Sequence, residues 1–265
     1  MMILKHKLFS HILIPVVIIV SSNIASGAID QAKIVGLWLF DESGGDITRD
    51  SSGNGHDGKI TGAQRVAGKF GNALEFKGKD FVTVPDAQDL RVGEKFTMQA
   101  WFFARDIGNW RQIIAKDNEY LLRIDPPQEG NKMSAFIKVN NAWEPRVSAA
   151  VPELETWIHI AATYDSDQVK LYIDGAMSGN GSRPGKVSPT KNPVEFGRWG
   201  GGLIGDDVGY FIGIIDEIAI FNTTLTEKDI KETMNGLQKF SMSVEASGKL
   251  AVAWGKIKSI SNISN

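Results

Sequence analysis

One short loop near the start of the sequence is dense in oxygen-bearing side chains. Residues 50–58 read DSSGNGHDG, which combines carboxylates, hydroxyls and an amide with several glycines. A loop of this kind can wrap around a hard cation and offer main-chain carbonyls as further ligands, which is calcium chemistry in kind. It is not an EF-hand, because the acidic spacing and the terminal glutamate are missing. The alternative is a tight turn that binds no ion.

Carboxylates also interrupt two apolar segments that lie far apart in the sequence. Residues 37–42 read LWLFDE, and residues 213–222 read GIIDEIAIFN. An acidic group in a half-buried strand costs free energy unless it is paired, hydrogen-bonded or bound to a cation. The two segments frame one domain and indicate where its ends meet.

Three tryptophans fall in polar, glycine-rich stretches rather than in strand patterns. Their contexts are GNWR for Trp110, NNAWE for Trp143 and GRWGGG for Trp199. The apolar faces of sugar rings suit aromatic side chains, while Asn, Arg and Asp can bind hydroxyls. The candidate ligand-binding residues are therefore Trp110, Arg111, Trp143, Arg198 and Trp199. The alternative for each tryptophan is a covering role at an end of the fold.

Groups for covalent catalysis are scarce. The sequence has no cysteine, which excludes disulfides and thiolate sites, and it has no Gly-x-Ser-x-Gly nucleophile motif. His159 lies inside an apolar strand pattern, which indicates a structural role. Asp216 and Glu217 are neighbours, so alternation along a strand predicts that they point to opposite faces. We therefore expect no catalytic residues.

The elements that must position these residues are short strands separated by turns. Runs rich in Val, Ile, Phe, Trp and Thr alternate with clusters of Gly, Asn, Asp and Pro, as in an antiparallel sandwich. We expect strands at about residues 33–40, 73–76, 81–84, 96–104, 112–116, 120–124, 134–139, 157–164, 169–173 and 210–221. Trp38, Trp101 and Trp157 fall within these strands and are expected in the core.

One short helix follows the last expected strand. Thr226 and Asp229 are spaced for a capping box, and Leu225 and Ile230 are spaced for a hydrophobic staple. The helix should run over residues 227–235 and stop at Gly236. It is too short to be stable alone, so it must dock on the sandwich.

The first residues have the pattern of a secretory signal peptide. Lys5 and Lys7 precede an apolar stretch over residues 8–20, and residues 26–28 read SGA. We expect cleavage after Ala28 and a secreted, extracellular or periplasmic protein; an uncleaved anchor is the alternative. Residues 1–28 contribute two of the 29 Lys and Arg and none of the 31 Asp and Glu, so the remaining chain has a formal net charge of −4. Such a charge does not favour nucleic acid or anionic lipid.

Several pieces in order resemble one known family. Residues 36–42 with 50–58, then 71–76 (GNALEF), 96–102, 157–161 with 171–175 (LYIDG), and the 215–217 strand with its helix look like bacterial laminin-G-like domains. These domains belong to the concanavalin A-like lectin/glucanase superfamily. The resemblance implies an all-β, two-sheet antiparallel jelly-roll sandwich with one short C-terminal helix.

The resemblance also implies a metal site. In related domains an aspartate on the last strand often joins the N-terminal segment around a structural calcium ion, which nominates Asp216 with Asp41 and Asp57. Related glucanases carry a Glu-x-Asp-x-x-Glu strand, and this sequence lacks it. The alternative is that these aspartates accept main-chain hydrogen bonds only.

Together these observations predict a signal peptide over residues 1–28, a laminin-G-like domain over 29–240 and a tail over 241–265. The domain is expected to be a secreted, non-catalytic module that binds extracellular carbohydrate or glycoprotein, with Ca²⁺ as a structural cofactor. A polysaccharide hydrolase or lyase is one alternative, and an adhesion or structural domain that binds another protein is the other.

Overall fold

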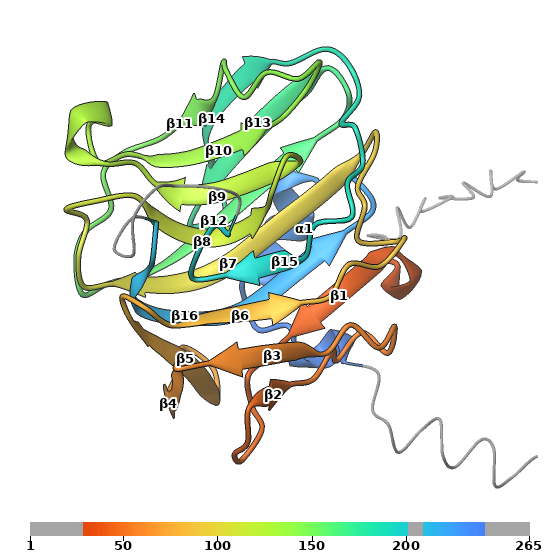
Figure 1. Ribbon diagram of the computed structural model, residues 1–265. Helices are drawn as coiled ribbons and strands as arrows, with labels where there is room; N and C mark the ends of the chain where they lie inside the picture. The colour runs from red at the N-terminus through yellow and green to blue at the C-terminus, as the bar shows by residue number, and fades with distance from the viewer. Residues whose placement is uncertain (1–28, 201–208, 242–265) are drawn as a thin grey trace, which may run out of the picture.

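The strands of the protein stack as two antiparallel sheets with their apolar faces inward. The computed structural model describes residues 29–200 and 209–241, and Figure 1 shows the two layers. Side chains alternate between the two faces of a strand, so one face of each sheet is buried against the other. The all-β jelly-roll sandwich that the sequence predicts is confirmed.

Each sheet contains eight strands. Sheet A has the order β14-β13-β12-β7-β16-β5-β4, with β1 paired to β16. Its strands are β1 (Ile34–Trp38), β4 (Gln64–Ala67), β5 (Asn72–Lys77), β7 (Phe96–Ala104), β12 (Trp157–Tyr164), β13 (Gln168–Ile173), β14 (Ala176–Ser182) and β16 (Ile212–Phe221).

Sheet B has the order β11-β10-β9-β8-β15-β6-β3-β2. Its strands are β2 (Ile47–Thr48), β3 (Gly58–Thr61), β6 (Phe81–Val84), β8 (Arg111–Lys116), β9 (Tyr120–Ile124), β10 (Met133–Ile137), β11 (Val147–Ser148) and β15 (Val194–Phe196). The helical elements are η1 (Gln31–Lys33), η2 (Pro127–Glu129), α1 (Glu227–Thr233) and η3 (Gln238–Phe240).

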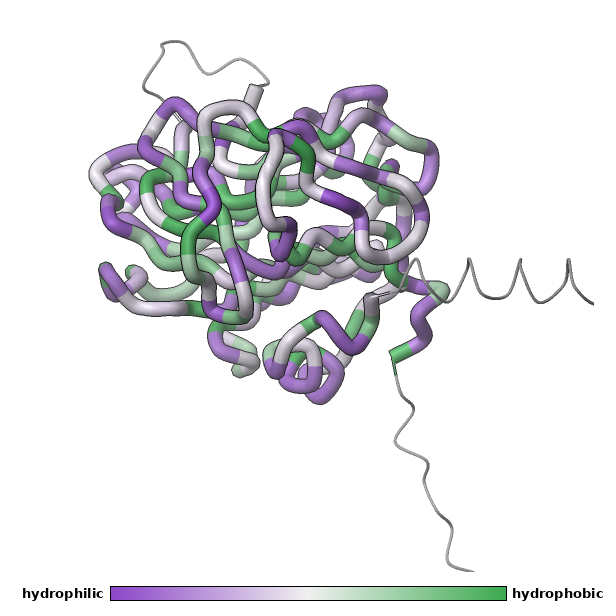
Figure 2. Tube along the Cα trace, turned by 90° about the horizontal axis from the view of Figure 1, so that it is seen from below, coloured by the Kyte–Doolittle hydropathy of each residue, from purple (hydrophilic) through white to green (hydrophobic). Residues whose placement is uncertain are grey.

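The two ends of the domain meet as predicted. Strand β1 pairs antiparallel with β16, from Ile34 opposite Phe221 to Trp38 opposite Ile218. The main core lies between the sheets, and a second apolar cluster lies on the outer face of sheet A beneath α1 and η3. In Figure 2 the hydrophobic stretches run through the stacked strands, while many hydrophilic stretches lie in the surrounding loops.

The predicted helix forms with the predicted caps. The Thr226 side chain accepts a hydrogen bond from the Asp229 N–H, and the Asp229 carboxylate accepts one from the Thr226 N–H. Leu225 and Ile230 both join the cluster on the outer face of sheet A. The helix ends at Thr233, slightly before the expected end.

Two expectations about strand residues are wrong. Trp157 is not in the core: it lies half-buried on the outer face of sheet A, with its ring centroid 5.7 Å from that of Phe103. Asp216 and Glu217 do not point to opposite faces. The register of β16 against β7 shifts between Asp216 and Ala219, and Glu217 has a φ of 47°. This bulge interrupts the alternation, so both carboxylates reach segments that pack on the outer face of sheet A.

The domain limits stay a prediction. The expected signal segment and all but the first residue of the expected tail lie outside the described residues. Within the described ranges, no helix is long and apolar enough to cross a bilayer.

Candidate functional site

A small apolar cluster lies on the face of sheet B that points away from sheet A. Phe136 of β10 pairs with Leu121 of β9, which pairs with Ala115 of β8. Their sequence neighbours, such as Tyr120 and Ile137, face the core, so alternation directs these three side chains outward. They are nevertheless buried, because two tryptophans pack over them.

Trp143 and Trp199 form that cover, which we call the tryptophan platform. Their ring centroids lie 6.0 Å apart in a T-shaped arrangement, and both side chains are half-buried. The indole N–H of Trp199 donates to Asp117 Oδ1 at 2.9 Å. The ammonium of Lys138 lies 5.7 Å from the centroid of the Trp143 ring. The structure thus brings two of the three predicted loop tryptophans together.

Two hairpin turns rich in asparagine border the platform. Val139 and Ala142 exchange main-chain hydrogen bonds around Asn140 and Asn141, whose φ angles are 51° and 66°. Asparagine tolerates this left-handed conformation, which a tight two-residue hairpin requires. In the β8–β9 turn, Asn118 has a φ of 65°. The two turns bring Asn118 and Asn141 to the lining of one pocket.

A pocket of about 180 Å³ lies beside the platform. Neither tryptophan lines it, but one of its lining residues is Lys138, whose ammonium lies near the Trp143 ring. Its lining combines amides, hydroxyls, a proline ring and one ammonium group. The lining residues are Asn118, Lys138, Asn141, Ser188, Pro189 and Thr190. Polar donors and acceptors next to aromatic rings are the usual composition of a small-ligand site.

Arg183 is buried against the loop that carries Trp143 and binds its main chain. The sequence analysis did not select this residue. Its guanidinium donates to the carbonyl oxygens of Ile137, Ala142 and Glu144. The residue is 8% exposed, and burial lowers its pKa from the ordinary value. Only tertiary structure brings residues 137–144 and 183 together, so the sequence holds no local signal for this contact.

Arg198 is bound to neighbouring side chains next to Trp199 rather than pointing into solvent. Its guanidinium donates to Glu195 Oε1 from Nε at 2.8 Å and from Nη2 at 2.6 Å, and it lies 3.3 Å from the centroid of the Phe81 ring. Glu195 also accepts the Gly200 N–H. Arg198 therefore positions the turn that carries Trp199.

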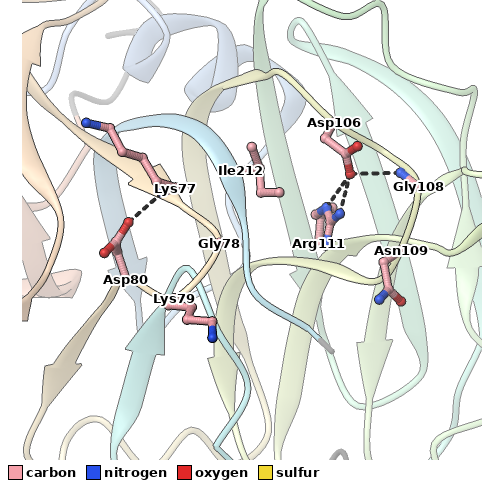
Figure 3. Close-up of a pocket in the computed structure, with 9 residues that line it drawn as sticks. All are labelled: Lys77, Gly78, Lys79, Asp80, Asp106, Gly108, Asn109, Arg111 and Ile212. Carbon is pink, nitrogen blue, oxygen red and sulfur yellow. Dashed lines mark hydrogen bonds and ion pairs between the residues drawn. The ribbon is translucent and has the colours of Figure 1, made fainter. Parts of the chain in front are cut away.

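The other two predicted binding residues lie at a different place, one end of the sandwich. Arg111 lines a cavity of about 590 Å³ between the turn that follows β5 and the loop between β7 and β8 (Figure 3). Its Nε donates to Asp106 Oδ1 at 2.8 Å, and its Nη1 donates to the Tyr210 carbonyl at 3.2 Å. Trp110 is half-buried directly before β8 and does not line this cavity. Neither residue belongs to the tryptophan platform.

The three aspartates predicted to bind calcium fall into two groups. Asp41 Oδ1 accepts the Asn72 N–H at 2.8 Å, and Asp216 Oδ2 accepts the Phe70 N–H at 3.0 Å, so both approach one turn. Asp57 lies in the 50–58 loop instead, where it pairs with Arg49 at 2.7 Å and accepts the Asp50 N–H at 2.9 Å. No cluster of three or more acidic or histidine side chains suited to a metal occurs in the described part of the chain.

Asp216 nevertheless has a feature that fits a hard cation. Its Oδ1 atom is buried and has no hydrogen-bond donor. Burial and the nearby charges of Glu217 and Asp41 raise the pKa of Asp216 to about 8. Burial also raises the pKa of Glu217 to about 7. Asp41 and Asp216 can supply oxygen ligands here, whereas Asp57 does not fit this group.

The family is shown by comparison with known sequences. The model of the concanavalin A-like lectin/glucanases superfamily matches residues 76–231, more than half of the chain. The chain belongs to this superfamily. It is therefore a lectin/glucanase-like domain, as the sequence pattern predicts. No curated protein matches the sequence.

Solved structures share the fold of this lectin/glucanase-like domain. Domain 4 of an extracellular arabinanase from Geobacillus stearothermophilus, in complex with arabinotriose, is 23% identical with a TM-score of 0.59 and covers 76% of this chain and 97% of its own. The binding domain of Paraclostridial Mosquitocidal Protein 1 is 16% identical, with a TM-score of 0.63 and coverages of 77% and 52%.

A sialidase from Trypanosoma rangeli is also similar. It is 18% identical, with a TM-score of 0.60, and the match covers 80% of this chain and 34% of the sialidase. The lectin/glucanase-like domain thus spans about half of the mosquitocidal binding domain and about a third of the sialidase. At these identities the similarity shows the fold alone.

Proposed function

We propose that this protein is a secreted, non-catalytic module that binds carbohydrate at the tryptophan platform. The observation that carries the proposal is the joining of Trp143 and Trp199 on one outer face, next to a pocket of amides and hydroxyls. An exposed aromatic surface can stack on a sugar ring, and the polar rim can bind its hydroxyls. The arabinotriose complex of the similar arabinanase domain supports this class of ligand.

The carboxylates near the platform support a binding role over a hydrolytic one. Asp117 accepts the indole N–H of Trp199, and Glu195 accepts from Arg198 and Gly200. A glycosidase needs two carboxyl groups that flank the scissile bond and are available to it. These two groups are held by the protein itself, so we assign them a positioning role.

Replacing Trp143 with alanine should lower the affinity for a bound oligosaccharide about tenfold to a hundredfold, because a stacked aromatic ring contributes about 1–3 kcal/mol. Glycan-array screening of the full chain would identify the oligosaccharide, and isothermal titration calorimetry would measure the affinity. Trp157→Ala is the matched control, because Trp157 lies half-buried on the other sheet. Equal affinity of the Trp143 variant and the wild type would show that the platform is not the site. A blank array would favour a protein partner.

We also propose that calcium stabilises the fold through Asp41 and Asp216. The support is the buried Oδ1 of Asp216, which has no donor, beside the carboxylate of Asp41. A cation bound there would offset the cost of burying negative charge.

Excess calcium should therefore raise the unfolding midpoint of the wild type, since a ligand of the native state stabilises it by about 2.7 kcal/mol at a hundred times its Kd. Asp216→Asn should abolish that increase, and in EDTA it should be as stable as the wild type or more so, because a neutral amide replaces a carboxyl group whose ionised form burial disfavours. Asp57→Asn is the control and should keep the calcium response. Thermal unfolding with EDTA or calcium measures both. No shift in the wild type, or an unchanged shift in Asp216→Asn, would refute the site.

A further inference from the structure

We propose that the pocket beside the platform selects a sugar ring that carries a carboxylate, such as a hexuronate, and that Lys138 pairs with that carboxylate. This inference rests on the proposed carbohydrate binding and adds the class of sugar. The first observation is the charge of the residues that line the pocket. Of the six residues that line it, Lys138 is charged and the other five are amide, hydroxyl or proline residues. The lining therefore carries a net positive charge.

The ammonium of Lys138 has donors to spare for a ligand. It donates to Asn118 Oδ1, which is a neutral acceptor. An ammonium group has three N–H donors, so this contact leaves two. Within residues 29–200 and 209–241, no carboxylate lies at ion-pair distance from Lys138. A bound carboxylate would supply the missing counter-charge.

The carboxylates nearest the pocket are already held by the protein. Asp117 accepts from the Trp199 indole through Oδ1 and from the Asn118 amide through Oδ2 at 2.7 Å. Glu119 Oε1 accepts the N–H of Thr190 at 2.7 Å and pairs with the buried Lys116 at 3.2 Å. Lys116 is also 3.1 Å from Asp86. Lys116 pairs with both Glu119 and Asp86, and the oxygens of Asp117 accept from neutral donors, so none of these carboxylates is ion-paired with Lys138.

The position of Lys138 suits a sugar stacked on Trp143. Its ammonium lies 5.7 Å from the ring centroid, near enough to meet a substituent of a ring on that tryptophan. The carboxylate of a hexuronate projects from the sugar ring, whereas the hydroxyls on the ring can reach Asn118, Asn141 or Thr190. A pocket of about 180 Å³ has room for one sugar unit rather than a long segment. A charge-assisted hydrogen bond is about twice as strong as a neutral one, so the carboxylate gives the preference.

The test compares oligosaccharides that differ in charge but not in ring shape. Oligogalacturonate and its methyl ester form one pair, alginate oligosaccharides add a second acidic backbone, and arabino- and gluco-oligosaccharides are the neutral probes. Calorimetry on the full chain should give an affinity for an acidic probe at least tenfold above that of its ester. Lys138→Gln should lower the affinity for the acidic probe about tenfold to a hundredfold, since a charged hydrogen bond contributes about 1.5–3 kcal/mol. It should lower the affinity for the neutral probes less than the affinity for the acidic ones.

Two further variants keep the test decisive. Lys138→Arg keeps the charge and should keep the preference for acid. Lys186→Gln removes an exposed lysine that pairs with Glu94, and it should change neither affinity. Equal affinity for acid and ester, or equal loss of both in Lys138→Gln, would overturn the acidic preference. If neutral binding then still depends on Trp143, the proposed function stands. If no probe binds, both proposals fail.

Discussion

Replacing Arg183 with methionine should lower the free energy of unfolding by about 2–4 kcal/mol. The guanidinium donates to three carbonyl oxygens in the segment 137–144 while it is 8% exposed. Its removal takes this donor from the Ile137 and Glu144 carbonyls, whereas the Ala142 carbonyl keeps the Val139 N–H. Each buried group left unsatisfied costs about 1–3 kcal/mol, partly offset because the charge no longer has to be buried. The same loop carries Trp143, so ligand affinity should fall as well. Urea denaturation measures the stability.

The matched control for Arg183 is a surface cation of the same segment. Lys186 pairs with Glu94, and the two side chains are 73% and 58% exposed. Lys186→Met should change the free energy of unfolding by less than about 1 kcal/mol, because exposed ion pairs contribute little. If the Arg183→Met variant were as stable as Lys186→Met, Arg183 would not stabilise the segment 137–144 as described.

Acid should destabilise the protein through His159. The side chain is 1% exposed, both ring nitrogens lack partners, and burial lowers its pKa to about 3. The unfolded chain binds a proton at His159 below its ordinary pKa of about 6.5, whereas the native state does not until about pH 3. Stability from this group is therefore fully present above pH 6.5 and is lost as the pH falls toward 3. The loss by pH 4.5 is about 2.7 kcal/mol.

A variant isolates the histidine from the carboxylates that also titrate in this range. His159→Leu keeps an apolar side chain of similar size beside Trp101, whose ring lies 5.3 Å away. Chemical denaturation at pH 7.0 and pH 4.5 should show a fall in stability about 2.7 kcal/mol smaller in the variant than in the wild type. Parallel pH profiles for the two proteins would show that His159 is protonated in the native state.

Local pattern was sufficient for most of the fold. The strands β6, β7, β9 and β12 have the predicted bounds, because each is an apolar run bounded by turn residues. Strands β2 and β11 have only two residues each, and β14 (Ala176–Ser182) is a mostly exposed edge strand rich in Gly and Ser. Such strands form because a neighbour supplies the pairing, so their own sequences give no strand signal.

The candidate site was only partly predictable for a similar reason. The sequence context indicated that Trp143 and Trp199 lie in loops, but their contact joins residues far apart in the chain. Trp110 has the same kind of context and lies outside the platform. Lys138 was not selected, because its role depends on a pocket whose lining joins residues 118, 138–141 and 188–190, which only the fold brings together. The bulge at Glu217 also made wrong the prediction that Asp216 and Glu217 point to opposite faces.

The indole N–H signals in a ¹⁵N–¹H NMR titration test the central claim most directly. An oligosaccharide that binds the full chain should shift the signals of Trp143 and Trp199, which form the platform, with mutants used for assignment. The signals of Trp38 in the main core and of Trp101 and Trp157 on the outer face of sheet A should stay in place. Shifts confined to Trp110 or Trp157, with Trp143 and Trp199 unchanged, would contradict carbohydrate binding at the tryptophan platform.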